Sequence, residues 1–527
     1  MTSGGMETWE SPTGRVLSGA RSTLEPVLTV LWHPDASRIG DRAVLLLEEG
    51  EGAELSRTRP ELFSPDGERV GALADPRLSR RPVVLRRRGR CLELEASRWR
   101  TRLEVDGVEV RGRLPLDFER IGDGVVLVLA RTVTLLLHLA PAILRSDAPR
   151  CGLVGESPLI HTLRAEIPAV AASDVSVLVR GASGTGKELV ARALHEHGPR
   201  ARKAFVAVDL GALTPSLASA ELFGVVRGAF TGADATRAGH FVEADGGTLF
   251  LDEIGEAPPE VQTTLLRVLE TRRVRPVGGS AEREVDVRVV AATDADLDAA
   301  ARDGGFRAAL LHRLAGYVLE TPRLAARRED VGRLLLHLLE REGWSPGPGD
   351  DATRFVPARL VASLARHPWP GNVRQLANVA RQLAIAGRAG GAPRLPLGVR
   401  RLVEEVELGG GDSTEPASRV EVEAESAPTR RGSSYRPISE IEDAVIVATL
   451  ERHRWRAKPA AEELGVSRSS LYRRLETLPG VVRAGDLDRV TIDAALVAHA
   501  GALDAAAQAL RVSREALQLR LRELDLS

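Results

Sequence analysis

Residues 175–197 read VSVLVRGASGTGKELVARALHEH, and this stretch decides the fold of the middle of the chain. The apolar, β-branched run at 175–179 is typical of a buried strand, and a helical stretch follows at 188–197. A glycine-rich turn between strand and helix directs backbone N–H groups at phosphate oxygens, next to the positive end of the helix. We therefore predict an ATP site in which the Lys187 ammonium reaches the β- and γ-phosphates. Its members are Gly181, Ala182, Ser183, Gly184, Thr185, Gly186, Lys187 and Glu188.

The residue after the lysine departs from the generic loop, which has Ser or Thr there to bind Mg²⁺. This chain has Glu188 instead. About sixty-five residues further on, an apolar strand ends in Asp252 and Glu253. Such a pair places one carboxylate beside the metal and the other beside the attacking water. We assign Asp252 to Mg²⁺ and Glu253 to polarising the water; the alternative is that both residues only cap the next helix.

The hydrophobic pattern divides the chain into several domains. Short β-type runs at 27–32, 83–87, 92–94, 102–105 and 125–137 predict an N-terminal β-sandwich. From 152 to about 321, strands alternate with helices, which predicts a parallel α/β sheet. A helical pattern follows, with Leu334, Leu335, Leu338 and Leu339 on one face. We expect a disordered tail over 1–20, a β-sandwich over 21–145, an α/β ATPase domain over 150–325, a helical lid over 326–395, a flexible linker over 396–437 and all-α helix-turn-helix units over 438–480 and 485–527.

A glycine-flanked hexapeptide lies between the phosphate loop and the acidic pair. It consists of Gly228, Ala229, Phe230, Thr231, Gly232 and Ala233. Each Gly weakens a regular element, so the pattern predicts the mobile tip of a loop that presents an aromatic ring. Within an ATPase, this hexapeptide resembles the loop by which bacterial enhancer-binding activators, which are AAA+ P-loop ATPases, engage the sigma-54 subunit of RNA polymerase. Gly-Lys-Glu at 186–188 is also typical of that family.

The resemblance extends from residue 152 to about 383 and implies three arginines that act on the nucleotide. Residues 306–314 resemble the segment by which one subunit of these hexamers inserts arginines, here Arg307 and Arg313, into its neighbour's ATP site. The sequence WPGNVR at 369–374 is similar to the family's lid signature, in which Arg374 returns to the nucleotide.

Two departures touch the implied catalytic machinery. The family usually has an Asn that switches the catalytic glutamate, where this chain has Asp209. Its sensor strand usually ends in Thr-Asn, where this chain has Thr293 and Asp294. Additional carboxylates near the acidic pair should repel the pair or raise the pKa of one of its members, which would slow or alter hydrolysis.

The C-terminal tail contains an internal repeat. Residues 460–478 and 506–524 are identical at ten of nineteen aligned positions, which indicates a duplicated module. The first copy, with helices expected at 438–453, 459–464 and 468–477, resembles the Fis-type helix-turn-helix that closes most sigma-54 activators. The resemblance implies that double-stranded DNA is bound by Arg468, Ser469, Ser470, Tyr472 and Arg473 on its recognition helix. The second copy has Leu519 in place of Arg473, and it serves either dimer packing or a second DNA contact.

Three motifs near the N-terminus, at 55–57, 75–82 and 105–107, resemble those of forkhead-associated (FHA) domains. Such β-sandwiches bind phosphothreonine through an Arg, a Ser and an Asn on loops at one end, and Arg57 and Ser79 match the first two. The structural His of that pattern is Pro82 here, and the Asn-Gly turn is lost near Trp99. The resemblance implies a sensor whose partner is a phosphothreonine protein or a kinase. A receiver domain is excluded because residues 1–150 contain no lysine to meet an acyl-phosphate.

Composition narrows the function. The 72 Lys and Arg residues balance 73 Asp and Glu, so a nucleic-acid surface must be local. Two cysteines fit a reducing cytosol, and we expect no signal peptide and no membrane partner. We expect a cytoplasmic activator that forms dimers to hexamers and hydrolyses ATP in a ring to remodel the closed sigma-54 RNA polymerase complex. The alternatives are a generic AAA+ protein remodeller and a non-hydrolysing DNA-binding adaptor, silenced by Asp209 and Asp294.

Overall fold

The computed structural model of the protein describes residues 24–97, 99–142, 148–229, 235–347, 349–388 and 395–409, and towards the C-terminus residues 441, 443–453, 455, 460, 463–464, 489–499, 503–510 and 517. The chain divides into two compact units, residues 1–416 and 417–527. The tail expected over 1–20 lies outside the described residues. Within the described part of the chain, no helix has both the length and the apolar character needed to cross a membrane.

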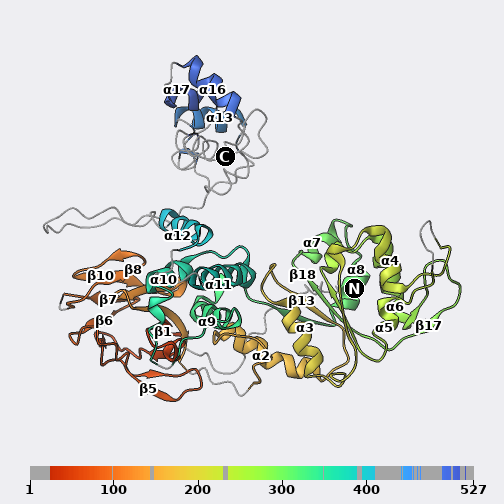
Figure 1. The fold of residues 1–527 in the computed structure, drawn as a ribbon, viewed down its shortest axis with the longest axis horizontal. Helices are drawn as coiled ribbons and strands as arrows, with labels where there is room; N and C mark the ends of the chain where they lie inside the picture. Colours follow the sequence, from red (N-terminus) through yellow and green to blue (C-terminus); the bar gives the residue numbers. More distant parts are fainter. Residues whose placement is uncertain are drawn as a thin grey trace, which may run out of the picture. The chain divides into compact units, whose positions relative to one another are not determined.

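The centre of the first unit is a five-stranded sheet in which all neighbouring strands are parallel (Figure 1). This arrangement confirms the predicted parallel α/β sheet. The strand order is β14 (Phe205–Asp209), β15 (Thr248–Asp252), β18 (Arg288–Thr293), β13 (Val177–Arg180) and β19 (Tyr317–Glu320).

Helices cover both faces of this sheet. Leu249 joins a core with α6 (Pro259–Thr271) and α8 (Ala308–Leu314), whereas its neighbour Phe250 joins a core with α2 (Pro158–Ala171) and α3 (Lys187–Glu196). Because both faces are buried, these strands are apolar at successive positions instead of alternating. The remaining elements are α4 (Pro215–Phe223), α5 (His240–Glu243), α7 (Leu297–Arg302) and the hairpin of β16 (Arg273–Val274) and β17 (Arg283–Glu284).

Four helices follow the sheet: α9 (Val331–Arg341), α10 (Ala358–Arg366), α11 (Asn372–Arg388) and α12 (Leu397–Gly409). The apolar face expected from Leu334, Leu335, Leu338 and Leu339 is confirmed, because all four side chains are buried. The expectation of a flexible linker from residue 396 is wrong at its start, where α12 forms. Val399 of α12 is fully buried in the core of this helical lid, and that contact orders a segment whose composition reads as a linker.

The N-terminal region contains two antiparallel sheets. An eight-stranded sheet has the order β5-β4-β2-β1-β12-β11-β8-β9, and a four-stranded sheet has the order β10-β7-β6-β3. The five predicted runs correspond to β1 (Leu24–Trp32), β6 (Val83–Arg88), β7 (Cys91–Glu95), β8 (Leu103–Val105) and the pair β11 (Val125–Leu129) and β12 (Val133–Pro141). The elements without a clear sequence pattern are β2 (Arg42–Val44), β3 (Gly52–Leu55), β4 (Leu62–Phe63), β5 (Arg69–Gly71), β9 (Val108–Glu109), β10 (Arg113–Asp117) and α1 (Phe118–Asp123).

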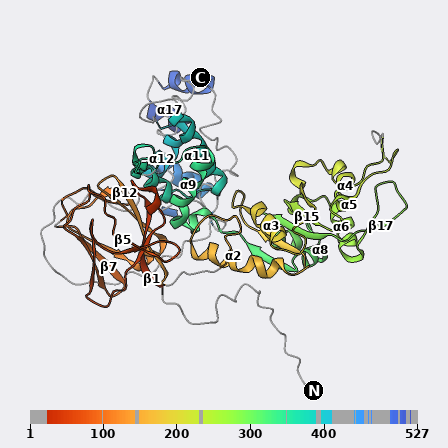
Figure 2. The same cartoon turned by 60° about the horizontal axis from the view of Figure 1, so that its bottom comes forward.

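This β region is packed onto the lid by a shared hydrophobic core. Trp32, Val126 and Leu136 belong to the same buried cluster as the apolar residues of α9, α10 and α11. Figure 2 shows these lid helices next to the sheet that contains β1 and β12. The other side of the sheet lies in a separate core formed with the four-stranded sheet. Strands β1, β11 and β12 are therefore apolar on both faces, which explains the long runs in their sequence.

Polar contacts cross the same junction. The Thr134 hydroxyl donates to the Ala358 carbonyl at 2.8 Å, and the Arg359 Nε lies 2.9 Å from the buried Glu104 Oε2. Arg77 pairs with Asp351 of the lid at 2.9 Å. The buried apolar area and the paired polar groups together hold the β region in a fixed position on the lid, so the two parts are not joined only by a flexible linker.

In the second unit, the described residues form α13 (Asp443–Arg452), α16 (Arg489–Ala498) and α17 (Leu503–Ala509). Ile492 of α16 packs with Ala506 and Ala507 of α17 and with Leu517 in a small buried core. The second copy of the repeat therefore contains its own packed helices.

Candidate nucleotide site

The glycine loop predicted at 181–186 connects β13 to α3. Gly184 and Gly186 have φ values of 75° and 104°, in the left-handed region that favours glycine. A Cβ at Gly184 would lie 2.4 Å from the carbonyl oxygen of Gly371 in the lid, so only glycine fits there. No side chain caps the first turn of α3, so no side chain of the described residues competes with an anion at this helix N-terminus.

Lys187 is the first residue of α3, and its side chain is only 7% exposed. Its ammonium donates to the Gly181 carbonyl at 3.0 Å and lies 3.3 Å from Glu253 Oε1. Glu188 behaves differently, because its exposed carboxylate pairs with Arg192 one turn along the helix at 2.8 Å. The loop hydroxyl that is buried belongs to Thr185, which donates to the Ala182 carbonyl at 2.7 Å.

The acidic pair lies at the carboxyl edge of the same sheet. Asp252 ends β15 and is in register with Asp209 at the end of β14. Glu253 has a φ of 49°, a conformation that is uncommon for a residue with a side chain and often marks a functional site. Its second oxygen, Oε2, accepts from the Asp294 N–H at 3.3 Å. The glutamate is thus held between Lys187 and the end of the neighbouring strand.

Burial raises the pKa of Asp252, and the nearby Asp209 adds to this rise, while Lys187 opposes it. Burial also raises the pKa of Glu253, where Lys187 again opposes and Asp294 adds. The prediction that the two additional carboxylates raise the pKa of this pair is therefore confirmed in direction. Burial is the larger cause for both groups.

The two predicted switch positions have local partners. Asp209 Oδ1 accepts from the Gly211 N–H at 3.0 Å and so caps a short helical turn. The buried Thr293 hydroxyl accepts from the Ala295 N–H at 3.0 Å.

The lid contacts the glycine loop directly. Arg374 Nη1 donates to the Ser183 hydroxyl at 2.8 Å, so the structure brings this predicted residue to the site. Asn372 was not predicted as a site residue, yet its Nδ2 donates to the Ser183 carbonyl at 2.9 Å and its Oδ1 accepts from the Leu324 N–H. The WPGNVR motif was the signal that could have identified it.

Arg307 and Arg313, the two arginines predicted to act on the neighbour's ATP, lie apart from the residues around the glycine loop. Arg307 directly precedes α8 as its N-cap residue, with its N–H donating to Gln262 Oε1 at 2.9 Å and its side chain exposed. Arg313 is exposed near the end of α8 and donates through Nη2 to the Leu269 carbonyl at 3.1 Å. It borders a cavity of about 240 Å³ whose wall includes Ser176 and Gly316, which directly precede β13 and β19. Arg313 is therefore at the amino edge of the sheet, opposite the glycine loop.

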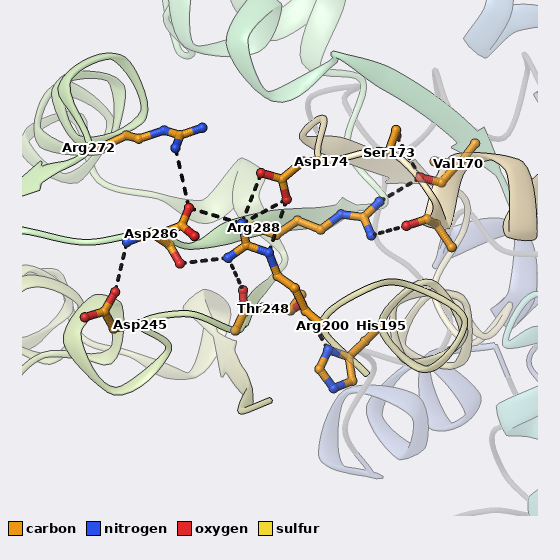
Figure 3. Close-up of polar contacts among 12 residues, drawn as sticks. Val170, Ser173, Asp174, His195, Arg200, Asp245, Thr248, Arg272, Asp286 and Arg288 are labelled. Carbon is orange, nitrogen blue, oxygen red and sulfur yellow. Dashed lines mark hydrogen bonds and ion pairs between the residues drawn. The ribbon is translucent and has the colours of Figure 1, made fainter. Parts of the chain in front are cut away.

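A network of charged residues holds the amino edge together (Figure 3). Arg200 pairs with Asp174 at 3.0 Å and with Asp286 at 3.1 Å, and the Asp286 N–H donates to Asp245 at 2.9 Å. Arg288, which is buried, donates to the carbonyls of Ala171 and Val170 at the end of α2. These contacts join the loops at the amino edge of the sheet. They hold in place the strands whose carboxyl ends carry the residues of the nucleotide site.

Other predicted sites are described only in part. Gly228 and Ala229 begin the hexapeptide, whereas Phe230, Thr231, Gly232 and Ala233 lie outside the described residues. Backbone bonds of 3.0 and 2.9 Å between Val225 and Arg237 close the base of this loop. The DNA-contact residues Arg468, Ser469, Ser470, Tyr472 and Arg473 also lie outside the described residues.

The two predicted phosphothreonine ligands lie side by side in the β region. The Arg57 N–H donates to the Ser79 carbonyl at 3.0 Å. The Ser79 side chain is buried, and its hydroxyl donates to the Arg81 carbonyl and accepts from the Arg81 N–H, each at 3.0 Å. The structure thus brings the pair together but engages the serine hydroxyl locally.

Comparison with known proteins assigns the central and C-terminal parts of the chain. Residues 153–320 match the sigma-54 interaction domain, residues 325–392 the AAA+ ATPase lid domain, and residues 437–478 the Fis family of bacterial regulatory proteins. The transcriptional regulatory protein ZraR of Escherichia coli (strain K12) is 38% identical over 361 residues, which is 68% of this chain and 76% of ZraR. The DNA-binding transcriptional regulator NtrC of the same strain is 37% identical over 372 residues, 69% of this chain and 78% of NtrC.

A solved structure of NtrX from Brucella abortus in complex with ADP is also similar. It is 29% identical with a TM-score of 0.42, and the match covers 63% of this chain and 70% of that one. The matched domains and the extent of identity to ZraR and NtrC agree with the glycine loop, acidic pair and lid contacts described above. The chain therefore belongs to the family of sigma-54-dependent transcription activators, which bind DNA and have ATPase activity.

Proposed function

We propose that this activator hydrolyses ATP between the subunits of a homo-oligomeric ring, and that the ring remodels the closed complex of sigma-54 RNA polymerase. One observation carries the proposal. Lys187, Glu253 and Arg374 gather at the carboxyl edge of the sheet, whereas Arg313 lies at its amino edge. Arg313 cannot reach the ATP of its own subunit from there, so a neighbouring subunit would have to supply that arginine.

Within one site, each residue would have a distinct part. The glycine loop and the first turn of α3 would hold the phosphates of ATP, and Lys187 would leave Glu253 to neutralise them. Asp252 fits Mg²⁺, which prefers one or two carboxylates together with phosphate oxygens and water. Mg²⁺, when bound, neutralises charge that develops on the transferred phosphoryl group. Glu253, released from Lys187, would orient and polarise the attacking water.

The arginines would complete the site from two directions. Arg374 would approach the phosphates from the lid of the same subunit. Arg307 and Arg313 would come from the neighbour, and a guanidinium in such a place accelerates phosphoryl transfer by about 10³–10⁵ in other NTPases. For this, Arg313 must release the Leu269 carbonyl to which it is bonded.

A mixing experiment tests this arrangement. Arg313→Ala and Glu253→Ala subunits should each be inactive, but their mixture should regain some ATP hydrolysis at interfaces that combine an intact Glu253 with an intact Arg313. The control mixture combines Arg313→Ala subunits with subunits that carry both Arg313→Ala and Glu253→Ala. It should stay inactive, because neither kind of subunit can donate the arginine. If the first mixture remains inactive while both variants still assemble, donation in trans is wrong.

The hexapeptide at 228–233 would be the contact with sigma-54. Phe230→Ala and Thr231→Ala should abolish binding of sigma-54 to the activator trapped with a transition-state mimic of ATP, while ATP turnover persists. Loss of ATP turnover with retained sigma-54 binding would show that the loop acts in ATP hydrolysis instead.

Enhancer DNA would be read by Arg468, Ser469, Ser470, Tyr472 and Arg473. Arg473→Ala should relax sequence preference, because a bidentate arginine contact to guanine is worth about 1–3 kcal/mol.

The β region would act as an FHA-like β-sandwich that senses a phosphorylated partner. The two antiparallel sheets with a common core support this fold, and the adjoining Arg57 and Ser79 support the site. Its packing on the lid would connect the sensor to the ATPase.

A further inference from the structure

Thr321 follows the last residue of β19 and is buried against the glycine loop. Its hydroxyl oxygen lies 2.7 Å from that of Thr185, which is also buried. Its N–H donates to the carbonyl of Arg180, the residue before the loop, at 2.8 Å. Thr321 therefore contacts the loop at its beginning and near its end.

The number of protons on the two hydroxyls fixes the direction of their hydrogen bonds. Each threonine hydroxyl carries one proton, and that of Thr185 goes to the Ala182 carbonyl at 2.7 Å. Thr185 therefore accepts the proton of Thr321. The alternative acceptor for Thr321, the Arg180 carbonyl, lies farther away at 3.2 Å and already receives the Thr321 N–H. The hydroxyls thus form a chain from Thr321 through Thr185 to the backbone of the loop.

The backbone of the loop leaves room for this close approach. A Cβ at Gly181 would lie 2.0 Å from Thr321 Oγ1 and 2.8 Å from the Thr321 carbonyl oxygen. A side chain at position 181 would therefore displace the threonine from the loop. Because both hydroxyls are buried, water cannot take the place of the hydrogen bond between them.

The segment that contains Thr321 also connects the sheet to the lid. Three residues further on, the Leu324 N–H donates to Asn372 Oδ1 at 2.9 Å. Asn372, the first residue of α11, donates in turn to the Ser183 carbonyl at 2.9 Å. Residues 321–324 are thus joined to the glycine loop directly at one end and through the lid at the other. The shape of the loop and the position of the lid therefore depend on the same short segment.

We propose that Thr321 is a positioning residue for ATP: its hydroxyl holds Thr185, and through it the glycine loop, in the shape that accepts the phosphates. The inference rests on the proposed function, because it takes this loop as the ATP site. Thr321 supplies no donor to the phosphates itself, since its one hydroxyl proton goes to Thr185. The loop holds the phosphates both before and during their transfer. Losing the hydroxyl therefore weakens the binding of ATP and leaves the turnover of bound ATP nearly unchanged.

Steady-state ATP hydrolysis by the full chain tests this role. Thr321→Val keeps the shape of the side chain and removes the hydroxyl. It should raise the KM for ATP about fivefold, the effect of losing one buried hydrogen bond, with a nearly unchanged kcat. Inorganic tripolyphosphate, which offers phosphates without a base or a sugar, should lose the same factor as a competitive inhibitor. Thr321→Ser, which restores the hydroxyl, should return both values to those of the wild type.

Thr134→Val is the matched control. Thr134 is a buried threonine whose hydroxyl donates to the Ala358 carbonyl at 2.8 Å, at the junction of the β region and the lid. Its loss should lower the melting temperature without changing the KM. If Thr321→Val behaves like this control, with a lower melting temperature but an unchanged KM and inhibition constant, the residue is only structural and the proposal is wrong.

A double-mutant cycle tests the route through Thr185. Thr185→Val should also raise the KM, and adding Thr321→Val should raise it no further, because both hydroxyls belong to one chain. Effects that multiply would overturn the action through Thr185. Lys187→Ala separates this inference from the proposed function. Normal hydrolysis by that variant would overturn the ATP site and the inference with it, whereas its inactivity together with an unchanged KM in Thr321→Val would overturn the inference alone.

Discussion

Gly332→Ala tests whether the β region is built onto the lid. Gly332 is the second residue of α9, and a Cβ placed there would lie 1.9 Å from the Leu31 carbonyl oxygen and 2.7 Å from its carbon. Both contacted atoms belong to the backbone of β1, which pairs with β2 on one side and β12 on the other. Leu31 is the extra residue of a bulge in β1, but the flanking Val30 and Trp32 pair with Leu135 and Thr134 of β12, so a shift of the Leu31 backbone would strain these pairings.

Two effects of opposite sign determine how Gly332→Ala changes the free energy of unfolding. Ala is favoured over Gly inside a helix by about 1 kcal/mol. Overpacking costs about 1–3 kcal/mol, and a clash with fixed backbone belongs near the upper end of that range. We therefore expect Gly332→Ala to destabilise the first unit, residues 1–416, by about 2 kcal/mol, which would lower its melting temperature by about 2–3 °C.

Differential scanning calorimetry of the full chain measures this change. The matched control is Gly122→Ala in α1, where the nearest atom to the new Cβ is Leu139 Cδ1 at 3.9 Å. The control should be neutral or stabilising, because it gains helix propensity without a clash. If Gly332→Ala is as stable as the wild type or more so, β1 does not contact α9 in solution, and the junction described here is wrong.

Further predictions concern the nucleotide site and acid stability. Lys187→Ala should abolish ATP hydrolysis, since the ammonium neutralises the phosphates during transfer, and unimpaired phosphate release would refute the site. Asp209→Asn should lower the pKa of Asp252, because Asp209 helps to raise it, and should therefore shift the acid limb of hydrolysis to lower pH; an unchanged limb would contradict this. Burial lowers the pKa of His138 to about 4, so its neutral form, bonded to the Thr29 hydroxyl, is favoured on folding. Its contribution should be lost as the pH falls from about 6.5 to 4, and His138→Gln should flatten the pH dependence of unfolding in that window.

The local sequence was sufficient to predict the elements whose hydrophobic or glycine pattern extends over only a few consecutive residues. The strand, glycine turn and helix at 175–197 predicted the loop that ends with Lys187, and an apolar run predicted the strand that carries Asp252. Backbone conformation and burial on both faces leave a direct mark on consecutive residues, so these features can be read without a structure.

Only the tertiary structure decided which of these residues meet. Asn372 and Arg374 contact Ser183 from a helix about 190 residues away, and Glu253 is held between Lys187 and the Asp294 N–H. The edge strands β4, β5 and β9 are too short to show a period, and α12 is ordered by the lid core into which Val399 packs. Such contacts depend on packing between segments that are distant in the sequence. The hydrophobic periodicity of a segment does not show which distant segment it will contact.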